Sequence, residues 1–214
     1  MAVRAVETRY SVPGWGVGEL WTRGDLVLAH EFVFDADAGG IPQALRAGSP
    51  KGADAPPTGN VRPNSSHMGD DFVPNQRLRT GEPTRTGAGF TEHPGDRSRL
   101  DPDVLARRLS LFLAGDDVGL DDVPLDLESS TPFQHAITTT LRRIPRGEIV
   151  SYGELAALSG YPGAGRAVGT FCARNRFMFL VPCHRVVGAV GIGGYGSAGV
   201  GIKRRLLALE GVAL

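Results

Sequence analysis

The stretch Pro182-Cys183-His184-Arg185-Val186 has residue types and a spacing that could carry chemistry. It follows an apolar run over 177–181 and precedes a glycine-rich stretch. Positive charge from the neighbouring imidazole and guanidinium would favour the thiolate of Cys183, and the thiolate is the nucleophilic form. A free cysteine is more often a buried, inert apolar residue. These five residues alone therefore leave Cys183 as either a reactive thiol or a core residue.

Two helix starts precede this stretch, each with the sequence of a capping box. Thr131-Pro132-Phe133-Gln134 opens an amphipathic pattern that runs to Ile144, and Pro145 with Gly147 ends it. Ser151-Tyr152-Gly153-Glu154 opens a second, shorter helix. A tight turn over 160–163 and a helix from about 164 to 175 follow. This outline indicates either a helix-turn-helix or an ordinary helical hairpin.

The expected helix over 164–175 has one side with almost no side chains, formed by Gly165, Ala167, Gly169 and Ala173. Glycine inside a helix is costly, so the small residues need a reason. They would allow the backbone to approach a large flat partner, with Arg166 projecting from the first turn. Close packing against another helix explains them equally well.

The rest of the chain divides by composition. Residues 1–47 read as strands over 3–12, 18–21 and 26–34, with turn signals between them. Residues 48–100 hold seven of the fifteen prolines and few large apolar side chains, which predicts a disordered insert or linker. Asp101-Pro102 starts a helix that Gly115 ends, and an acidic loop follows to residue 130.

Charge is segregated along a chain whose net charge is zero. Residues 131–214 hold ten Lys and Arg against three acidic residues, whereas 101–130 hold eight acidic residues against two Arg. The basic half is the candidate for a polyanionic partner. The sequence shows neither a signal peptide nor an apolar run that could span a bilayer, and it has two cysteines. A cytoplasmic protein with reduced thiols, not bound to a membrane, is expected.

The heptad over 181–187 resembles the active-site signature of the O6-alkylguanine-DNA alkyltransferases, also called methylated-DNA–protein-cysteine methyltransferases. Residues 147–156 are similar to the segment that opens the family's helix-turn-helix. Gly165-Arg166-Ala167-Val168-Gly169 resembles its recognition helix with an arginine finger. Asn175 and Glu210 lie where the family has its hinge asparagine and the acid of its Cys-His-Glu relay. Several motifs in order are more specific than one, and the chain is identified as a member.

The resemblance covers residues 101–214 well and 1–47 loosely, and it implies a fold. We expect an α/β N-terminal domain (small sheet plus helix) joined to a mostly α C-terminal domain with a winged-helix-like helix-turn-helix. The expected divisions are an N-terminal sheet domain (1–47), a disordered insert or linker (48–100), a helix with an acidic connecting loop (101–130) and a catalytic DNA-binding domain (131–214).

The resemblance also implies repair of O6-alkylguanine in double-stranded DNA, and it leaves repair of O4-alkylthymine open. The damaged nucleotide would be flipped out, and its alkyl group would pass irreversibly and stoichiometrically to Cys183, without turnover, cofactor or metal. The protein would be a monomer without an obligate protein partner. It would lie in the cytoplasm, on the nucleoid when bound to DNA, or in the nucleus of a eukaryote.

Residue roles follow from the resemblance by position. The catalytic residues implied are Cys183, His184, Glu210, Tyr152 and Asn175. In this scheme His184, oriented by Glu210, deprotonates Cys183 through a water, and Tyr152 supplies a proton to guanine. The DNA-binding residues implied are Arg166, Ala167, Gly169, Ser151 and Tyr152, with Arg166 filling the place of the flipped base. The base-binding pocket implied consists of Tyr152, Cys172, Val186, Tyr195, Gly196 and Ser197.

Four departures from the family pattern and four alternative functions remain. Arg176 stands where the family usually has proline, the glycine-rich loop differs around Tyr195, and the insert over 48–100 is unexpected. Cys172 falls in the recognition helix, as a bystander, a pocket-lining residue or a site of side alkylation. No cysteine precedes Cys172, so a cysteine-based N-terminal zinc site cannot form. The other readings are a damage sensor without transfer, a helix-turn-helix transcription regulator, a Cys-His hydrolase, and a zinc site at Cys172, Cys183 and His184.

Overall fold

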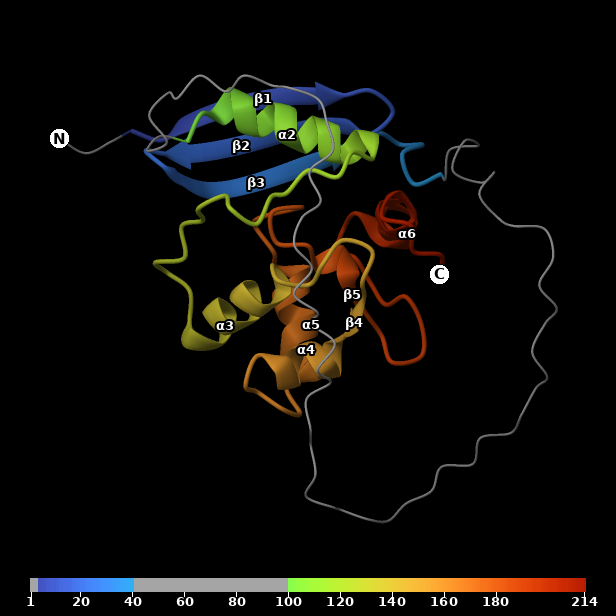
Figure 1. Cartoon of the computed structure of the whole chain (residues 1–214). Helices are drawn as coiled ribbons and strands as arrows, with labels where there is room; N and C mark the ends of the chain where they lie inside the picture. The colour runs from blue at the N-terminus through green and yellow to red at the C-terminus, as the bar shows by residue number, and fades with distance from the viewer. Residues whose placement is uncertain (1–3, 41–99) are drawn as a thin grey trace, which may run out of the picture. The chain divides into compact units, whose positions relative to one another are not determined.

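The computed structural model describes residues 4–40 and 100–214, and its first part is a three-stranded antiparallel sheet in the order β1-β2-β3 (Figure 1). The strands are β1 (Val6–Val12), β2 (Gly16–Arg23) and β3 (Leu26–Phe34). The predicted turns separate them, and Gly14 and Gly24 there have positive φ angles of 71° and 60°. β2 is longer than predicted because its alternate residues continue to face the core.

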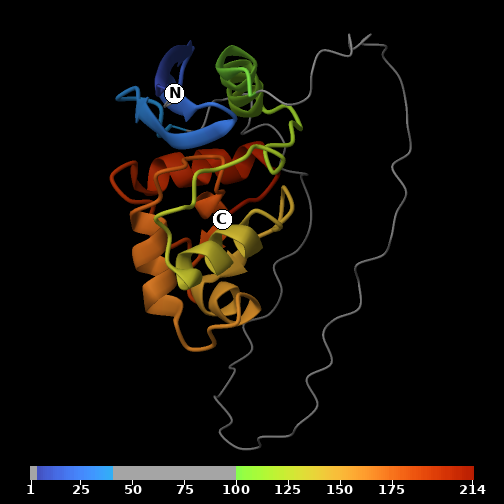
Figure 2. The same ribbon diagram turned by 90° about the vertical axis from the view of Figure 1, so that its left-hand side faces the viewer.

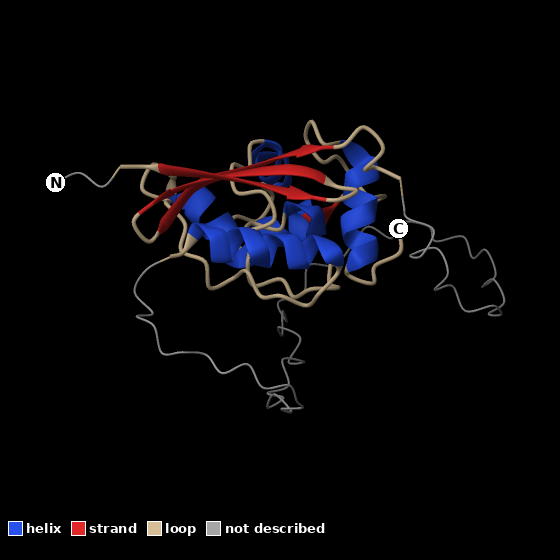
Figure 3. Ribbon diagram, turned by 90° about the horizontal axis from the view of Figure 1, so that it is seen from above, coloured by secondary structure: helices blue, strands red, loops and turns tan. Residues whose placement is uncertain are grey.

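Helix α2 (Pro102–Ala114) runs alongside this sheet, over β1 and β2 (Figures 1 and 3). The Asp101 carboxylate accepts hydrogen bonds from the backbone N–H groups of Asp103 and Val104, and Gly115 ends the helix at φ 102°. These caps confirm the predicted bounds. The buried face of α2 consists of Leu105, Ala106, Leu109, Phe112 and Leu113.

The second part of the chain is mostly helical. It contains α3 (Pro132–Leu141), α4 (Tyr152–Leu158), α5 (Gly165–Ala173), the 3-10 helix η1 (Cys183–Arg185) and α6 (Gly199–Leu209). Both capping boxes are present, at Thr131 and at Ser151. The prediction that α3 reaches Ile144 was wrong, because the helix ends at Leu141 and residues 142–144 form turns. Pro145 disfavours the helical conformation of the residue before it, Ile144. The sequence did not predict α6, which lies beneath the sheet (Figure 2).

Two short strands connect the start of α4 to the segment after the reactive stretch. β4 (Val150–Ser151) pairs in parallel with β5 (Val186–Val187). This pairing places Tyr152, the first residue of α4, beside the loop that follows Cys183. The helix, turn and helix of α4 and α5 match the predicted outline, and the winged-helix form stays a prediction.

The N-terminal sheet contacts the second part through backbone pairs and side chains. The backbone of His30 in β3 pairs in parallel with Phe177, and Val27 pairs with Leu125. The guanidinium of Arg205 in α6 lies 3.6 Å from the centre of the Trp15 ring. The small sheet with its helix, followed by a helical region, agrees with the predicted fold class at this level. The insert over 48–100 lies almost wholly outside the described residues, so the domain divisions stay predictions.

Within residues 4–40 and 100–214, every helix is too short or too polar to cross a membrane.

Candidate active site

Asn175 organises the backbone around Cys183. Its Nδ2 donates to the carbonyl of Val181 at 2.9 Å and lies 3.3 Å from Cys183 Sγ. Its Oδ1 accepts from the backbone N–H of Phe177 at 3.0 Å. One amide therefore ties the segment before the nucleophile to the thiol itself, which is consistent with the hinge role that the resemblance implies.

His184, Arg185 and Glu210 form a buried charged cluster next to Cys183. His184 Nε2 lies 2.9 Å from Glu210 Oε1, and Arg185 donates to both carboxylate oxygens at 3.0 and 2.9 Å. Burial raises the pKa of Glu210, but the hydrogen bonds from His184 and Arg185 outweigh it and bring the pKa to about 2. Glu210 therefore stays ionised and accepts the Nε2 proton of His184.

His184 is a neutral base in this arrangement. It is completely buried, and burial lowers its pKa, although Glu210 partly offsets the shift. With the proton on Nε2, the lone pair is on Nδ1. That atom is buried and has no hydrogen-bond partner among the described residues. The cluster therefore presents one unused basic nitrogen in the buried interior, on the residue that follows Cys183.

The positive charge that acts on Cys183 does not come from its sequence neighbours, contrary to expectation. Arg185 is held by Glu210 and by the carbonyl of Ile144 at 2.6 Å. Burial raises the pKa of Cys183, and Asn175 and Lys203 partly offset this. Lys203 is fully buried and donates to the carbonyls of Val186 at 2.5 Å and Gly194 at 3.1 Å.

Lys203 was missed in the sequence, although a signal exists. It lies three and four residues before Leu206 and Leu207, on the apolar side of a helical pattern that also includes Ile202. A lysine at such a position is either buried or at the edge of the core. The helical spacing of the apolar residues around it could have marked Lys203 as a candidate buried cation.

A cavity of about 90 Å³ opens at Cys183. Its lining residues are Tyr152, Gly169, Cys172, Ala173, Cys183, Gly194, Tyr195 and Gly196. Four of the six predicted pocket residues are thus brought together at the thiol. The other two do not line it: Val186 is fully buried with its carbonyl on Lys203, and Ser197 faces a different hollow beside β3.

Two groups in this cavity have strongly raised pKa values. Burial raises the pKa of Cys172 to about 12, so this second thiol stays protonated and unreactive. Burial and the adjacent Cys183 thiol raise the pKa of Tyr195. Lys203 lowers the pKa of both thiols, whereas the hydrogen bond from Asn175 acts on Cys183 alone.

The predicted DNA-binding residues lie on α4 and α5. Arg166 and Ala167 are exposed on α5, and Gly169 faces the ring of Tyr152. The hydroxyl of Ser151 caps α4 by accepting from the Glu154 backbone N–H at 3.2 Å. Gly165 has another use, because a Cβ there would come within 3.4 Å of the Gly153 backbone. Close helix packing therefore explains Gly165, and an exposed surface is left at Arg166 and Ala167.

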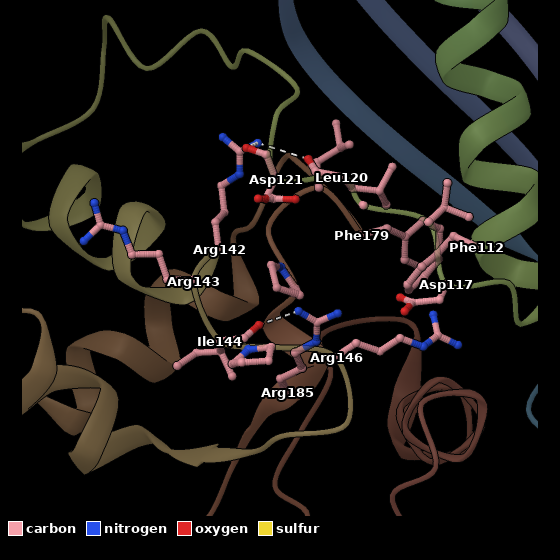
Figure 4. A pocket seen from close by; sticks show the side chains of 15 residues that line it. Phe112, Asp117, Leu120, Asp121, Arg142, Arg143, Ile144, Arg146, Phe179 and Arg185 are labelled. Atoms are coloured by element: carbon pink, nitrogen blue, oxygen red, sulfur yellow. Dashed lines mark hydrogen bonds between the residues drawn. The ribbon is translucent and has the colours of Figure 1, made fainter. Parts of the chain in front are cut away.

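A second hollow, of about 440 Å³, lies behind the active-site segment (Figure 4). Arg142 donates to the carbonyls of Leu120, Asp121 and Val123, and Arg146 donates to Gly115, Asp116 and Leu209. Arg176, the departure from the family's proline, likewise donates to the carbonyl of Asp126 at 2.6 Å. Arg142 and Arg146 thus attach the acidic connecting loop to the turn after α3, and Arg176 attaches it to the segment before Cys183.

Comparison with known proteins agrees with this geometry. The family model for the 6-O-methylguanine DNA methyltransferase DNA-binding domain matches residues 132–212. A methylated-DNA–protein-cysteine methyltransferase of Mycolicibacterium paratuberculosis is 42% identical over 144 residues, which are 66% of this chain and 81% of that protein. The chain belongs to the methylated-DNA–protein-cysteine methyltransferase family. The predictions of the family and of the enzyme class are confirmed.

Further members of the methylated-DNA–protein-cysteine methyltransferase family show the same likeness. The Shigella flexneri enzyme is 42% identical over 118 residues, 55% of this chain and 68% of its own length. The crystal structure of Mycobacterium tuberculosis OGT in complex with DNA matches with a TM-score of 0.58 and 28% identity, over 96% of this chain and 92% of that one. Among the described residues, no three His, Cys, Asp or Glu side chains are grouped as metal ligands would be.

Proposed function

We propose that this chain repairs O6-alkylguanine in double-stranded DNA by moving the alkyl group to Cys183. The observation that carries the proposal is the position of the Cys183 thiol. It lies at the wall of a cavity of about 90 Å³, in contact with Asn175 and next in sequence to His184, which pairs with Glu210. A transfer to sulfur needs a thiol, a base, a fixed orientation and a pocket, and these are the groups gathered here.

The alkylated base has to leave the helix stack to reach this thiol, because Cys183 is buried beneath α5. Flipping a nucleotide costs a few kcal/mol. In the proposal Arg166 fills the vacated place in the stack, while Ala167, Gly169 and Ser151 lie against the minor groove. Tyr152 contacts both the DNA backbone and the base, since it lies at the start of α4 and also lines the cavity.

The transfer step balances with the groups present. The Cys183 proton passes, by way of a water, to His184 Nδ1, and Glu210 stabilises the resulting imidazolium. The sulfur then forms a bond to the alkyl carbon while the bond between that carbon and guanine O6 breaks. Guanine takes a proton from Tyr152 as it leaves, and the proton held by His184 then returns through solvent to the Tyr152 phenolate. The product is a thioether, which is stable, so each molecule reacts once and no cofactor takes part.

The base is recognised at two places in the proposal. The carbonyl of Cys183 accepts from the guanine amino group, and the backbone N–H of Gly196 donates to O6, since both residues line the cavity. Cys172 lines the pocket without reacting.

The test is the intact mass of the protein after incubation with a duplex that contains O6-methylguanine, followed by peptide mapping. One methyl group per protein, on the peptide that contains Cys183, is expected, and Cys183→Ser should gain none. An unmodified wild-type protein that still binds the damaged duplex would replace this proposal with a damage sensor. A methyl group on Cys172 in place of Cys183 would show that the proposal names the wrong acceptor thiol.

A further inference from the structure

Phe179, four residues before Cys183, has a costly backbone conformation. Its φ is 67°, and it is the sole non-glycine residue with positive φ in the described part of the chain. The N–H of Leu180 donates to the Met178 carbonyl across it at 2.9 Å, which closes a three-residue turn. Such a turn with positive φ at its centre is rare and strained, above all for a bulky side chain. Strain of this kind persists only where the surroundings impose it.

The surroundings of Phe179 are four aromatic rings, which we call the aromatic cage. Ring centres of His30, Phe32, Phe34 and Phe112 lie 5.6, 5.5, 6.4 and 5.7 Å from that of Phe179. Three of them come from β3 and the fourth from α2, and Figure 4 shows Phe112 and Phe179 side by side. Phe179 itself is 2% exposed. The N-terminal sheet and α2 therefore enclose the ring while the Phe179 backbone keeps its positive φ.

His30 also holds the backbone of the same turn. Its Nδ1 lies 2.7 Å from the Met178 carbonyl, and its Nε2 lies 2.7 Å from the hydroxyl of Tyr10. The backbone N–H of His30 donates to the Arg176 carbonyl at 2.8 Å, and that of Met178 donates to the His30 carbonyl at 3.2 Å. The oxygen that closes the strained turn is thus fixed from the sheet side as well.

The turn is linked to the nucleophile through four hydrogen bonds that meet at Val181 and Cys183. The N–H of Val181 donates to the Phe177 carbonyl at 2.8 Å, and the N–H of Cys183 donates to the Val181 carbonyl at 2.8 Å. Asn175 joins that same Val181 carbonyl to Cys183 Sγ. A change of conformation at Phe179 would move Val181, and with it both the backbone and the thiol of Cys183.

We propose that Phe179 is a positioning residue for the alkyl transfer. The aromatic cage holds the Phe179 backbone at its strained positive φ, and this conformation fixes the position of the Cys183 thiol. The inference rests on the proposed role of Cys183 as the acceptor. It gives the N-terminal sheet a defined part in the reaction, which is to keep one turn left-handed.

A pair of variants separates this role from ordinary packing. Phe179→Ala and Phe179→Gly both remove the ring, but only glycine adopts positive φ without a penalty. The measurement is the first-order rate of methyl transfer at saturating O6-methylguanine duplex, corrected for the folded fraction. We expect both variants to be slower than wild type, and Phe179→Gly to be about 5- to 30-fold faster than Phe179→Ala, the factor that the left-handed penalty corresponds to. Equal rates, or a faster alanine variant, would overturn the proposal, because packing alone favours the larger side chain.

A second measurement keeps binding apart from positioning. In a Cys183→Ser background, the affinity for the damaged duplex should stay within about twofold on changing Phe179, because α5 does not carry the turn. Phe133→Ala is the matched control, since Phe133 packs on Tyr161 at 5.0 Å, outside the cage; its rate should equal that of wild type. If neither Phe179 variant folds, Phe32→Leu removes one ring of the aromatic cage and keeps an apolar side chain in its place. A wild-type transfer rate for Phe32→Leu would then refute the positioning role of Phe179.

The proposed function fails in a different way. If wild-type protein gains no methyl group on Cys183, the acceptor assignment is wrong whatever the variants do. If wild-type protein is methylated there and the glycine and alanine variants do not differ, only the positioning role is lost.

Discussion

Replacement of Lys203 by methionine tests how a buried thiol becomes a nucleophile. The substitution keeps the length of the side chain and removes its charge. Lys203 is fully buried, and none of the ion pairs within residues 4–40 and 100–214 includes it. Burying a cation without an acidic partner is costly. We expect such a cation where a negative charge forms during the reaction, here on Cys183 Sγ.

The size of the effect follows from Coulomb's law. Two unit charges about 5–10 Å apart attract each other by about 2–3 kcal/mol at an effective dielectric constant of ~20. Since one pKa unit corresponds to 1.36 kcal/mol, Lys203→Met should raise the pKa of Cys183 by about 1–2 units. The carbonyls of Val186 and Gly194 also lose their donor, at a cost of about 1–3 kcal/mol each. Removal of a buried charge offsets part of that cost, so the variant should remain folded.

The assay is the first-order rate of methyl transfer at saturating duplex, measured from about pH 7 to about pH 11, because burial places the pKa of Cys183 above the ordinary cysteine value of ~8.5. The inflection of the Lys203→Met profile should move to higher pH by about 1–2 units. Lys203→Arg keeps the charge and should keep the wild-type inflection, even if it is slower. A slower Lys203→Met variant with an unchanged inflection would refute the electrostatic argument. Lys203 would then act only by anchoring the two carbonyls.

Three further predictions follow from the same structure. Arg166→Ala should slow transfer at saturating duplex by about 10- to 100-fold, because the flipped state loses a few kcal/mol of support; rapid-quench kinetics would show it, and an unchanged rate would exclude base replacement by Arg166. Glu210→Gln leaves Arg185 and His184 without their carboxylate and should lower the free energy of unfolding by about 3–5 kcal/mol, measured in urea; a change below about 1 kcal/mol would contradict this. The pKa of His30 is lowered by burial from 6.5 to about 4, so the unfolded chain binds more protons between these values. The free energy of unfolding should therefore fall by about 3 kcal/mol as the pH falls from about 6.5 to about 4, and His30→Gln should flatten that slope.

Much of the helical framework could be read from the sequence because its signals are local. Asp101, Thr131 and Ser151 act on backbone groups two or three residues away, so their roles are the same in any fold that contains the helix. Helix ends were less certain where two signals compete, as before Pro145. Helix α6 was missed because its glycines weaken the pattern, and packing against η1 and the sheet stabilises it instead.

The reactive cysteine and the identity of its partners were also evident from sequence, through motifs in a recognisable order. The electrostatic roles of the charged residues around the thiol were not evident from the sequence. The sequence places His184 and Arg185 beside the thiol, yet in the fold both turn to Glu210, and Lys203 acts on Cys183 instead. Electrostatic effects depend on distance and burial in space, which sequence adjacency does not determine.

Residue types, helix caps and the order of motifs were thus determined by the sequence itself, because each depends on the chain within a few residues. The strained turn at Phe179 was decided only by the tertiary structure. Nothing local favours positive φ at a phenylalanine, and the conformation exists because His30, Phe32, Phe34 and Phe112, distant in sequence, close around its ring. Long-range packing can impose a backbone state that local preference opposes, and it does so here four residues from the thiol.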